Sequence, residues 1–372
     1  MIKEGNTKCT RRMKIQIFVE SIGANQRTAV AAAPLRMCFL LFGLIFSFSN
    51  LLGQTRQQFH TLSTAWARPM AMGGAFMAVE DNLPALLYNP ANFVLFADPH
   101  ANRFTVFLNP VGVGAALSKH EHLHGRKEWR VNEAATALEL FVRALAFGGQ
   151  AYEFAALFGE ESPDPAIADR PQFLNAEHYA SNQYSLVAGR VKFADRVAIG
   201  ATAGLYYQAR ATGRQWGVGF SYGVTLLSSR DLRIGVSYWS FPKDMTEYRL
   251  QRERIVHEAV NFGIAYKAPF GLLAAMDIRN VGEEAPLPGR EFHFGVEQQL
   301  FKWLVWRAGY FRDRTDGLSH LSTGIGLIDQ NLWRPQRLRL QGPDWAVQYA
   351  LQFEKQGMQK IYTHALTFLI RL

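Results

Sequence analysis

The chain has very little cysteine. Its 372 residues include only Cys9 and Cys38, and both lie within the first 38 positions. The rest of the sequence therefore excludes disulfide bonds and thiolate metal sites as sources of stability or chemistry.

Long apolar runs are also nearly absent. The only one, 38–48, covers about 11 residues, whereas a membrane-spanning helix needs about 20. A basic flank at Arg36, the apolar run and a small-residue exit are typical of a secretory signal. We predict a leader over residues 1–53, cut after Gly53 or Gln54. Residues 1–36 are basic and lack apolar periodicity, so Met37 is an alternative start.

Only a small excess of positive charge remains once this leader is removed. The formal net charge is +9, but residues 1–54 hold seven Lys and Arg and two Glu, a net of +5, which leaves +4. A patch that would bind nucleic acid is therefore not predicted.

What the chain has instead is strict alternation. Apolar residues from Trp216 to Leu226 occupy every second position, and Gly, Ser and Thr occupy the positions between them. Successive side chains of a strand point to opposite faces, so one face is apolar and the other is small and polar. The pattern first appears near Phe104 and recurs about every 10 to 25 residues as far as Leu372.

This pattern predicts an all-β fold. Short connections, as at 193–197 and 228–232, alternate with longer polar ones, as at 244–254 and 282–288. A transmembrane barrel of the outer membrane has these features, with lipid outside and a polar lumen inside. We expect about 14 antiparallel strands, with 12 to 16 as the range. The stretch 113–117 is a further candidate strand, 136–158 is a hairpin turning at Gly148-Gly149 or a helix pair, and 159–182 is a long extracellular loop.

The segment before the first strand does not alternate. Residues 55–98 are rich in Ala, Met and Gly, and helical turns are expected at 75–80 and 84–88. Gly73-Gly74 and Asn89-Pro90 are turn signals. We therefore divide the chain into a leader (1–53), an N-terminal plug (54–100) and a barrel (101–372).

The stretch 67–92 resembles the N-terminal segment of the PorV/PorQ family, which is related to the FadL-type transporters of hydrophobic compounds. The resemblance rests on Ala67, Arg68, Met72, Gly73, Gly74, Ala75, Asp81, Ala85, Tyr88, Asn89, Pro90 and Ala91. Asn92 departs from the family pattern, where Gly is usual, and Leu372 stands where many barrels end in an aromatic residue. The resemblance implies a barrel of about 14 strands with an N-terminal plug.

The resemblance also implies two roles. The first is binding or guiding exported proteins at the outer membrane, as in type IX secretion, with secreted cargo or secretion-machinery proteins as partners. The alternative is a FadL-like channel for hydrophobic small molecules. In either case we expect a monomeric barrel surrounded by outer-membrane lipid, without a cofactor, without nucleic acid and without enzymatic activity.

Two groups of residues are candidates for function. The residues of the first group should hold the plug in place inside the barrel: Arg68, Gly73, Gly74, Asp81, Asn89, Pro90 and Ala91. The second comprises polar residues on lumen-facing positions: Arg190, Arg233, Glu291, His293, Glu297 and Arg307. Glu291 and Glu297 could form a catalytic carboxylate pair, but pairing of such lumen charges with facing Arg or Lys is the preferred interpretation.

Two further motifs resemble functional sites, but their surroundings favour a structural interpretation. The stretch 219–223 matches the G-x-S-x-G nucleophile motif, but that chemistry needs a sharp strand-to-helix turn, and here the alternation continues unbroken. His120, His122 and His124 would share one face of an extended segment and could bind zinc or copper. Their polar surroundings favour a solvated loop, so we predict no metal site.

The lumen faces carry many glycines. Glycine inside a strand often marks close approach of another backbone, so these positions favour a lumen filled by the plug or by polar contacts over a wide apolar tunnel. For strand 232–240 we expect that arginine at Val236, which should face lipid, disrupts assembly, and that arginine at Ser237 is tolerated if the lumen is wet.

Overall fold

The computed structural model describes residues 56–60, 66–95, 103–109, 141–149, 151–161, 181–193, 196–210, 213–242, 249–250, 253–254, 258–281, 290–301, 303–312, 319–328, 344–356 and 359–372. Arg56–Leu372 forms one compact unit. The predicted leader, the candidate strand 113–117, the histidine run and most of the 159–182 loop lie outside the described residues.

The described residues are mostly strands. Helical elements are confined to α2 (Ala67–Ala71), α3 (Ala85–Tyr88) and the 3-10 turn η1 (Pro90–Asn92). The strands are β1 (Arg56–His60), β2 (Arg103–Leu108), β3 (Val142–Gly148), β4 (Tyr152–Glu161), β5 (Ser181–Phe193), β6 (Val197–Arg210), β7 (Gly213–Leu227), β8 (Leu232–Ser240), β9 (Arg249–Leu250), β10 (Glu253–Arg254), β11 (Glu258–Lys267), β12 (Leu272–Arg279), β13 (Glu291–Phe301), β14 (Leu304–Arg312), β15 (Ser319–Ile328), β16 (Asp344–Gln356) and β17 (Gln359–Arg371). Among the residues that the structure describes, no helix has the length and apolar character needed to cross a membrane.

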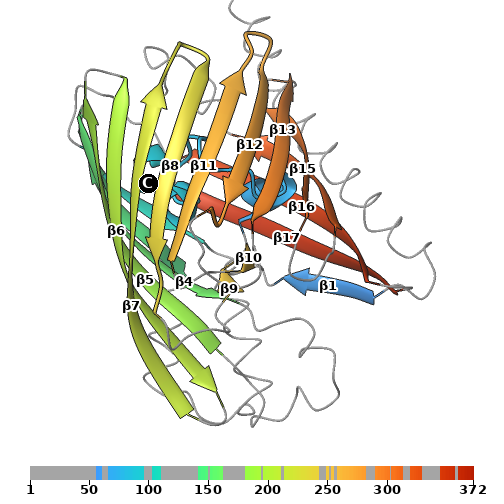
Figure 1. Cartoon of the computed structure of the whole chain (residues 1–372), viewed down its shortest axis with the longest axis horizontal. Helices are drawn as coiled ribbons and strands as arrows, with labels where there is room; N and C mark the ends of the chain where they lie inside the picture. Colours follow the sequence, from blue (N-terminus) through green and yellow to red (C-terminus); the bar gives the residue numbers. More distant parts are fainter. Residues whose placement is uncertain are drawn as a thin grey trace, which may run out of the picture. The chain divides into compact units, whose positions relative to one another are not determined.

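Fourteen antiparallel strands close into a barrel (Figure 1). Neighbouring strands in the chain pair in order from β2 to β17, except that the short pair β9 and β10 stands apart between β8 and β11. The barrel closes where β17 pairs with β2, with Ile370 opposite Leu108 and Arg371 opposite Phe107. The predicted fold and strand number are confirmed.

One strand was not expected. β1 pairs in parallel with β17, from Arg56 opposite Ile361 to His60 opposite Ala365. β17 is much longer than its two-residue contact with β2, and an uncovered strand edge presents backbone groups that another strand can pair with. The segment before the barrel therefore contributes a strand to the sheet, contrary to the assignment of 54–100 to a plug alone.

The ambiguous stretch 136–158 contains a hairpin. β3 and β4 pair in register, with Phe147 opposite Phe154, and Gly149 N–H donates to the Tyr152 carbonyl at 2.8 Å across the turn. The turn falls at Gly148-Gly149, as the hairpin alternative required.

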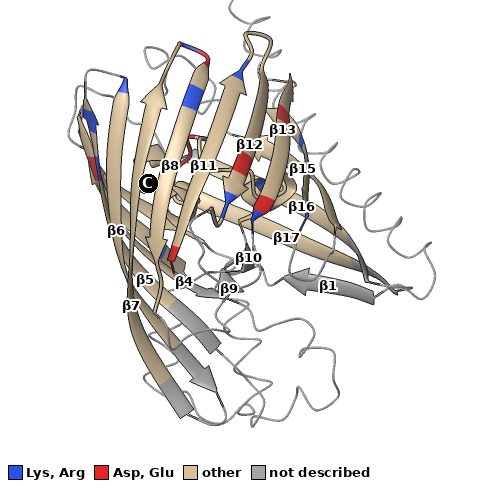
Figure 2. Ribbon diagram, viewed as in Figure 1, with Lys and Arg blue, Asp and Glu red and all other residues tan. Residues whose placement is uncertain are grey.

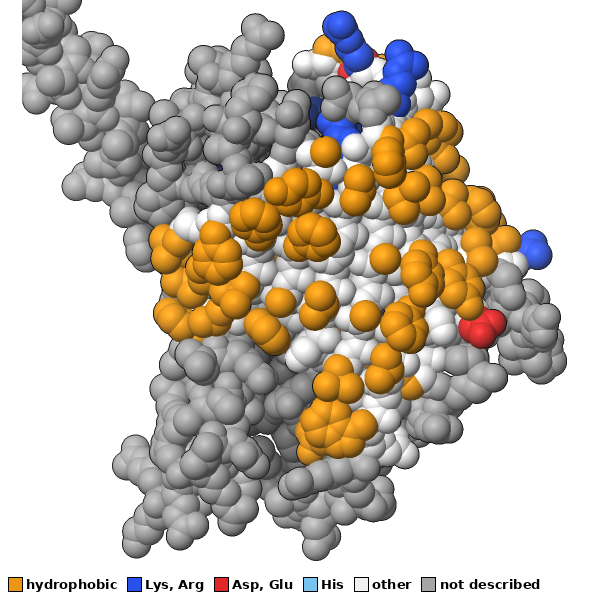
Figure 3. Space-filling view, turned by 90° about the vertical axis from the view of Figure 1, so that its left-hand side faces the viewer, with side chains coloured by type: hydrophobic (Ala, Val, Ile, Leu, Met, Phe, Trp, Pro, Cys, Tyr) orange, Lys and Arg blue, Asp and Glu red, His pale blue; other side chains and the backbone are white. Residues whose placement is uncertain are grey.

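The outer surface of the barrel is apolar. The alternating residues of β7 point outward, and Trp216 is 64% exposed. Figure 2 shows that the middle of β6 and β7 carries no charged residue, and Figure 3 shows hydrophobic side chains spread over one face with charges at its margins. An exposed apolar area this large marks a surface that water does not cover. The protein is an outer-membrane barrel, and this face contacts lipid.

A charge on this face should block assembly. We expect Val224→Arg, which places a cation on an outward position that is 44% exposed, to cost about 2–4 kcal/mol near the bilayer midplane. The matched control is Ser228→Arg, in the turn between β7 and β8. Heat-modifiability gels of purified outer membrane measure the folded fraction. Equal folding of the two variants would mean that Val224 does not face lipid.

Residues 66–95, here called the inner segment, contact the inward side of the barrel. A helical turn lies at α3, as expected, but none forms over 75–80, so that prediction is wrong. Gly73 and Gly74 have φ of 60° and 75° after α2. The next backbone N–H groups, of Phe76 and Met77, donate to the Asp277 carboxylate of β12 instead of to a helix.

Candidate functional site in the barrel interior

Glycines line the barrel where the inner segment lies closest. A Cβ at Gly309 would meet the backbone of Met72 and Gly73, and a Cβ at Gly235 would meet the Met77 carbonyl. On seven strands an added Cβ would lie within 3 Å of an atom of the inner segment. That atom belongs to the backbone at Gly200, Gly235, Gly295 and Gly309, and to a side chain at Gly223, Gly263 and Gly324. Since only glycine leaves room for another backbone at this distance, the close approach predicted from lumen glycines is confirmed here.

A buried ionic network joins the inner segment to β13 and β14. The Glu297 carboxylate accepts two bonds from Arg68, at 2.7 and 2.9 Å, and one from Arg307 at 2.6 Å. Arg68 also pairs with Asp81 at 2.8 Å. Burial would lower the pKa of Arg68, but the charges of Asp81 and Glu297 outweigh it and hold the pKa above its ordinary value.

The network continues along β8 and β5. Arg233 pairs with Glu80 of the inner segment at 2.8 Å. Arg190 donates to the Ala91 carbonyl at 2.8 Å and pairs with Glu153. Bidentate and charge-assisted bonds of this kind have restricted geometry, so they fix the inner segment at several points along its length.

The Asn89-Pro90-Ala91 motif makes both a local turn and a contact with the wall. Asn89 Oδ1 accepts from Ala91 N–H at 3.1 Å, which forms an Asx turn. Asn89 Nδ2 donates to the Met77 carbonyl at 2.8 Å and to Thr225 Oγ1 of β7 at 3.2 Å. One side chain therefore fixes the turn and attaches it to β7.

The other lumen-facing candidates have separate partners. His293 contacts the Gly73 carbonyl through Nδ1 at 2.7 Å and Glu291 through Nε2 at 3.2 Å. Glu291 and Glu297 are thus bonded to different groups rather than to each other. Ser221 lies in the uninterrupted strand β7, without the turn that a nucleophile elbow needs.

Two contributors were missed by sequence reasoning. Asp277 Oδ2 accepts from Phe76 N–H at 2.6 Å and from Met77 N–H at 3.0 Å. Arg279 donates to the Gly74 carbonyl and stacks over Tyr88, 5.0 Å from the ring centroid. The signal was the i, i+2 spacing of two opposite charges in an otherwise apolar strand, which places both on one face.

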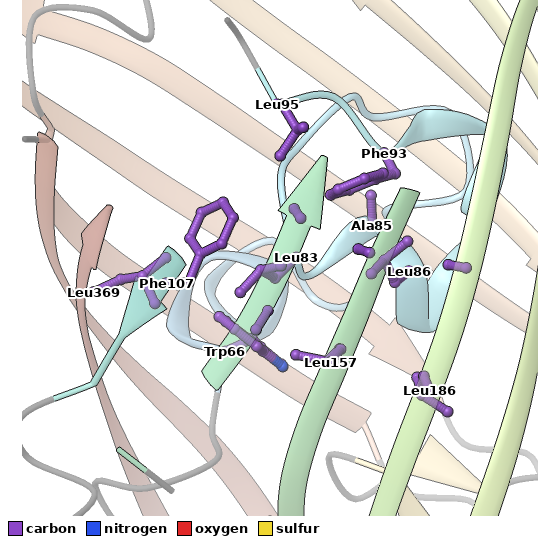
Figure 4. Packing of buried hydrophobic residues seen from close by; sticks show 14 of the residues in the cluster. Trp66, Leu83, Ala85, Leu86, Phe93, Leu95, Phe107, Leu157, Leu186 and Leu369 are labelled. Atoms are coloured by element: carbon purple, nitrogen blue, oxygen red, sulfur yellow. The ribbon is translucent and has the colours of Figure 1, made fainter. Parts of the chain in front are cut away.

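Part of the inner wall formed by β2 to β5 is apolar and packs against the inner segment. Figure 4 shows Phe107, Leu157 and Leu186 of the wall directed toward the inner segment. The same cluster contains Leu83, Leu86 and Phe93. We call this surface the apolar wall. Sequence reasoning missed the apolar wall because β3 to β5 carry apolar residues on both faces. Without alternation, the sequence does not show which residues of these strands face inward.

Aromatic rings extend the apolar wall toward β8. Tyr206 of β6 packs against the cluster and meets Phe241 edge-on, with ring centroids 4.6 Å apart. Cations also lie on this side of the barrel: the Arg143 guanidinium is 4.9 Å from the Trp66 ring centroid and donates to Tyr184 Oη, and Arg190 of β5 pairs with Glu153 of β4. The interior therefore combines a polar, glycine-lined side with an apolar, aromatic side.

A cavity of about 90 Å³ lies beside the ionic network. Its lining comes from the inner segment and from positions of β8, β11 to β14, β16 and β17: Trp66, Arg68, Val79, Glu80, Asp81, Asn82, Pro84, Arg233, Lys267, Leu273, Glu297, Arg307, Ala346, Gln348, Thr367 and Leu369. The strand positions lie toward the short turns β7–β8, β11–β12 and β13–β14, which face the periplasm in such barrels. Within the described ranges no group of His, Cys, Asp and Glu residues is arranged to hold a metal ion.

Comparison with known proteins shows a likeness in structure only. No family model matches the chain, and no curated protein sequence matches it. The toluene transporter TbuX of Ralstonia pickettii superposes with a TM-score of 0.50 at 13% identity, covering 84% of this chain and 98% of that one. The toluene transporter TodX of Pseudomonas putida gives 0.46 at 13% identity, with coverage of 84% and 98%. A Pseudomonas aeruginosa FadL homologue gives 0.42 at 12% identity, with coverage of 84% and 96%. The chain therefore shares its barrel fold with the toluene transporter TbuX.

Proposed function

We propose that this protein is an outer-membrane channel for hydrophobic small molecules. The observation that carries the proposal is the apolar side of the barrel interior, where the apolar wall packs against apolar side chains of the inner segment. Ligand sites for apolar molecules are concave surfaces lined by aliphatic and aromatic side chains with few polar groups. The toluene transporter with which the chain shares its fold supports the same class of solute.

The inner segment serves as the plug of this channel. Its bonds to Glu297, Asp277 and Arg190 hold it in the lumen, so ions have no wide aqueous path. Passage of an apolar molecule along the apolar wall requires the side chains of the inner segment that cover this wall to move. The role inferred from the PorV/PorQ resemblance, binding or guiding exported proteins, has no support from the fold comparison and is the second candidate.

Truncating the aromatic extension of the apolar wall should slow uptake. We expect Tyr206→Ala and Phe241→Ala each to reduce accumulation of labelled toluene severalfold in cells that lack other such channels. Each variant removes ring contacts inside the barrel. The control is Tyr222→Ala, because Tyr222 is 52% exposed on the outer face. Heat-modifiability gels confirm equal amounts of folded barrel.

The same cells separate the two candidate functions. Unchanged toluene uptake in both variants, together with exported proteins that co-purify with the barrel in stoichiometric amounts, would overturn the channel proposal in favour of cargo binding. Reduced uptake without such partners supports the channel.

A further inference from the structure

We propose that Glu291 and His293 of β13 share one titratable proton that holds the glycine turn of the inner segment against the barrel wall. Loss of this proton loosens the inner segment, so the pair is a pH-sensitive latch inside the lumen. The inference does not depend on which solute the barrel carries, because it concerns only the contact between β13 and the Gly73 carbonyl.

Both ring nitrogens of His293 face oxygen atoms. Nδ1 lies 2.7 Å from the Gly73 carbonyl oxygen, and Nε2 lies 3.2 Å from a carboxylate oxygen of Glu291. A backbone carbonyl can only accept a hydrogen bond, so Nδ1 carries a proton. The second contact also needs a proton, held either by Nε2 or by the carboxyl group. A neutral imidazole beside an ionised carboxylate has only one proton for the two contacts, so the pair holds one more.

The charges around the pair favour retention of this proton. Strand register places Asp277 of β12 opposite His293 and Arg279 opposite Glu291, and residues paired in this way point to the same face. All four side chains are buried. Within this group two carboxylates face one guanidinium, so a protonated imidazole brings the formal charge of the group to zero. A buried group with a net charge would be costly.

Ring stacking restricts how the His293 imidazole can turn. Phe311 of β14 lies opposite His293 and stacks on it, with ring centroids 5.0 Å apart and planes at 14°. His320 of β15 stacks on Phe311 in turn, at 4.1 Å, and bonds to Gln352. The stack keeps the two imidazole nitrogens directed at Gly73 and Glu291.

The Gly73 carbonyl belongs to the turn at which the inner segment meets the wall. Gly73 and Gly74 both have positive φ, and Gly73 lies against Gly309 of β14. Without the shared proton, the Nε2 lone pair would face an ionised carboxylate oxygen in a buried site, where such repulsion is strong. Relief requires the ring to move, which breaks its bond to the Gly73 carbonyl. The bonds from Asp277 to the following residues remain, so the turn loosens while the inner segment stays in the barrel.

The test follows the proton, which is bound at low pH and lost as the pH rises. Ion conductance of the full-length mature barrel in planar bilayers is measured from about pH 5 to about pH 9.5, which spans the ordinary titration of histidine. We expect low conductance at the acidic end and a rise of about tenfold in the open fraction at the alkaline end, the effect of losing one charge-assisted bond. Hydrogen exchange of residues 70–80, corrected for the intrinsic effect of pH on exchange, should accelerate over the same interval.

Glu291→Gln is the decisive variant. The glutamine amide can donate to Nε2 of a neutral imidazole, so both contacts of His293 are satisfied without the additional proton. Conductance and exchange should therefore stay low over the whole pH range. His293→Ala removes the contact with the Gly73 carbonyl and should give high conductance at every pH.

His320→Gln is the matched control, because His320 belongs to the same stack but bonds to Gln352 of β16. It should keep the pH dependence of the wild type. The proposal is overturned if conductance and exchange of the wild type do not change with pH, or if Glu291→Gln keeps the wild-type increase. Should His293→Ala fail to fold, Glu291→Gln and the exchange measurement decide the question.

Discussion

Adding one methyl group at Gly309 is expected to unseat the inner segment. The Cβ of Gly309→Ala would lie 2.7 Å from Gly73 Cα, with other backbone atoms of Met72 and Gly73 closer still. Backbone cannot rotate away as a side chain can, so overpacking should cost about 1–3 kcal/mol or more. We expect a lower thermal unfolding temperature and a higher ion conductance in planar bilayers, because a displaced inner segment fills the lumen less completely.

Gly189→Ala is the matched control for this substitution. A Cβ there would meet only the Phe154 ring, at 3.0 Å, and a ring edge can shift by a few tenths of an ångström. Its stability and conductance should stay close to wild type. Wild-type behaviour of Gly309→Ala would mean that the inner segment does not press against β14.

Loss of the Glu297 carboxylate is expected to be the most destabilising single change in the ionic network. Glu297→Ala removes three charge-assisted bonds and leaves Arg307 buried without its carboxylate partner, while Arg68 keeps its ion pair with Asp81. Removing one member of a buried ion pair costs about 3–5 kcal/mol. Urea unfolding of the purified barrel, followed by tryptophan fluorescence, measures this loss.

The control for this variant is Glu258→Ala, at an exposed position on the opposite end of β11 from the network. Exposed substitutions usually change stability by no more than about 0.5 kcal/mol. Glu297→Gln should fall between the two, since the amide keeps the volume but not the charge. Equal unfolding curves for Glu297→Ala and Glu258→Ala would show that the network contributes little to holding the inner segment.

One expectation about tolerance is reversed by the structure. Ser237 faces inward, as the alternation predicts, but it is 1% exposed and its Oγ contacts Met77 Sδ at 3.2 Å. Arginine at this position would not enter water, so the tolerance expected for a wet lumen does not hold. The sequence pattern identified the face correctly and could not reveal what covers it.

Some elements could be predicted because their signal is local. The outward residues of β7, β8, β11 and β13 alternate with small or polar ones. The sequence of each of these strands therefore indicates which face contacts lipid and which faces the lumen. β12 escaped notice because its inward face includes Leu273 and Ala275 as well as Asp277, which blurs the alternation. The apolar wall of β2 to β5 was hidden for the same reason.

The sequence alone determined the class of this protein. Period-two alternation over the strands, with short and long connections in turn, requires a sheet with one apolar and one small or polar face, and only closure satisfies its edges in a membrane. Tertiary structure decided which residues meet inside. Glu297 and Arg68 are 229 positions apart, and the glycines at the inner wall have meaning only beside the inner segment. Local periodicity reports the environment of each side chain, whereas its partner depends on strand register and on the path of a distant segment through the lumen.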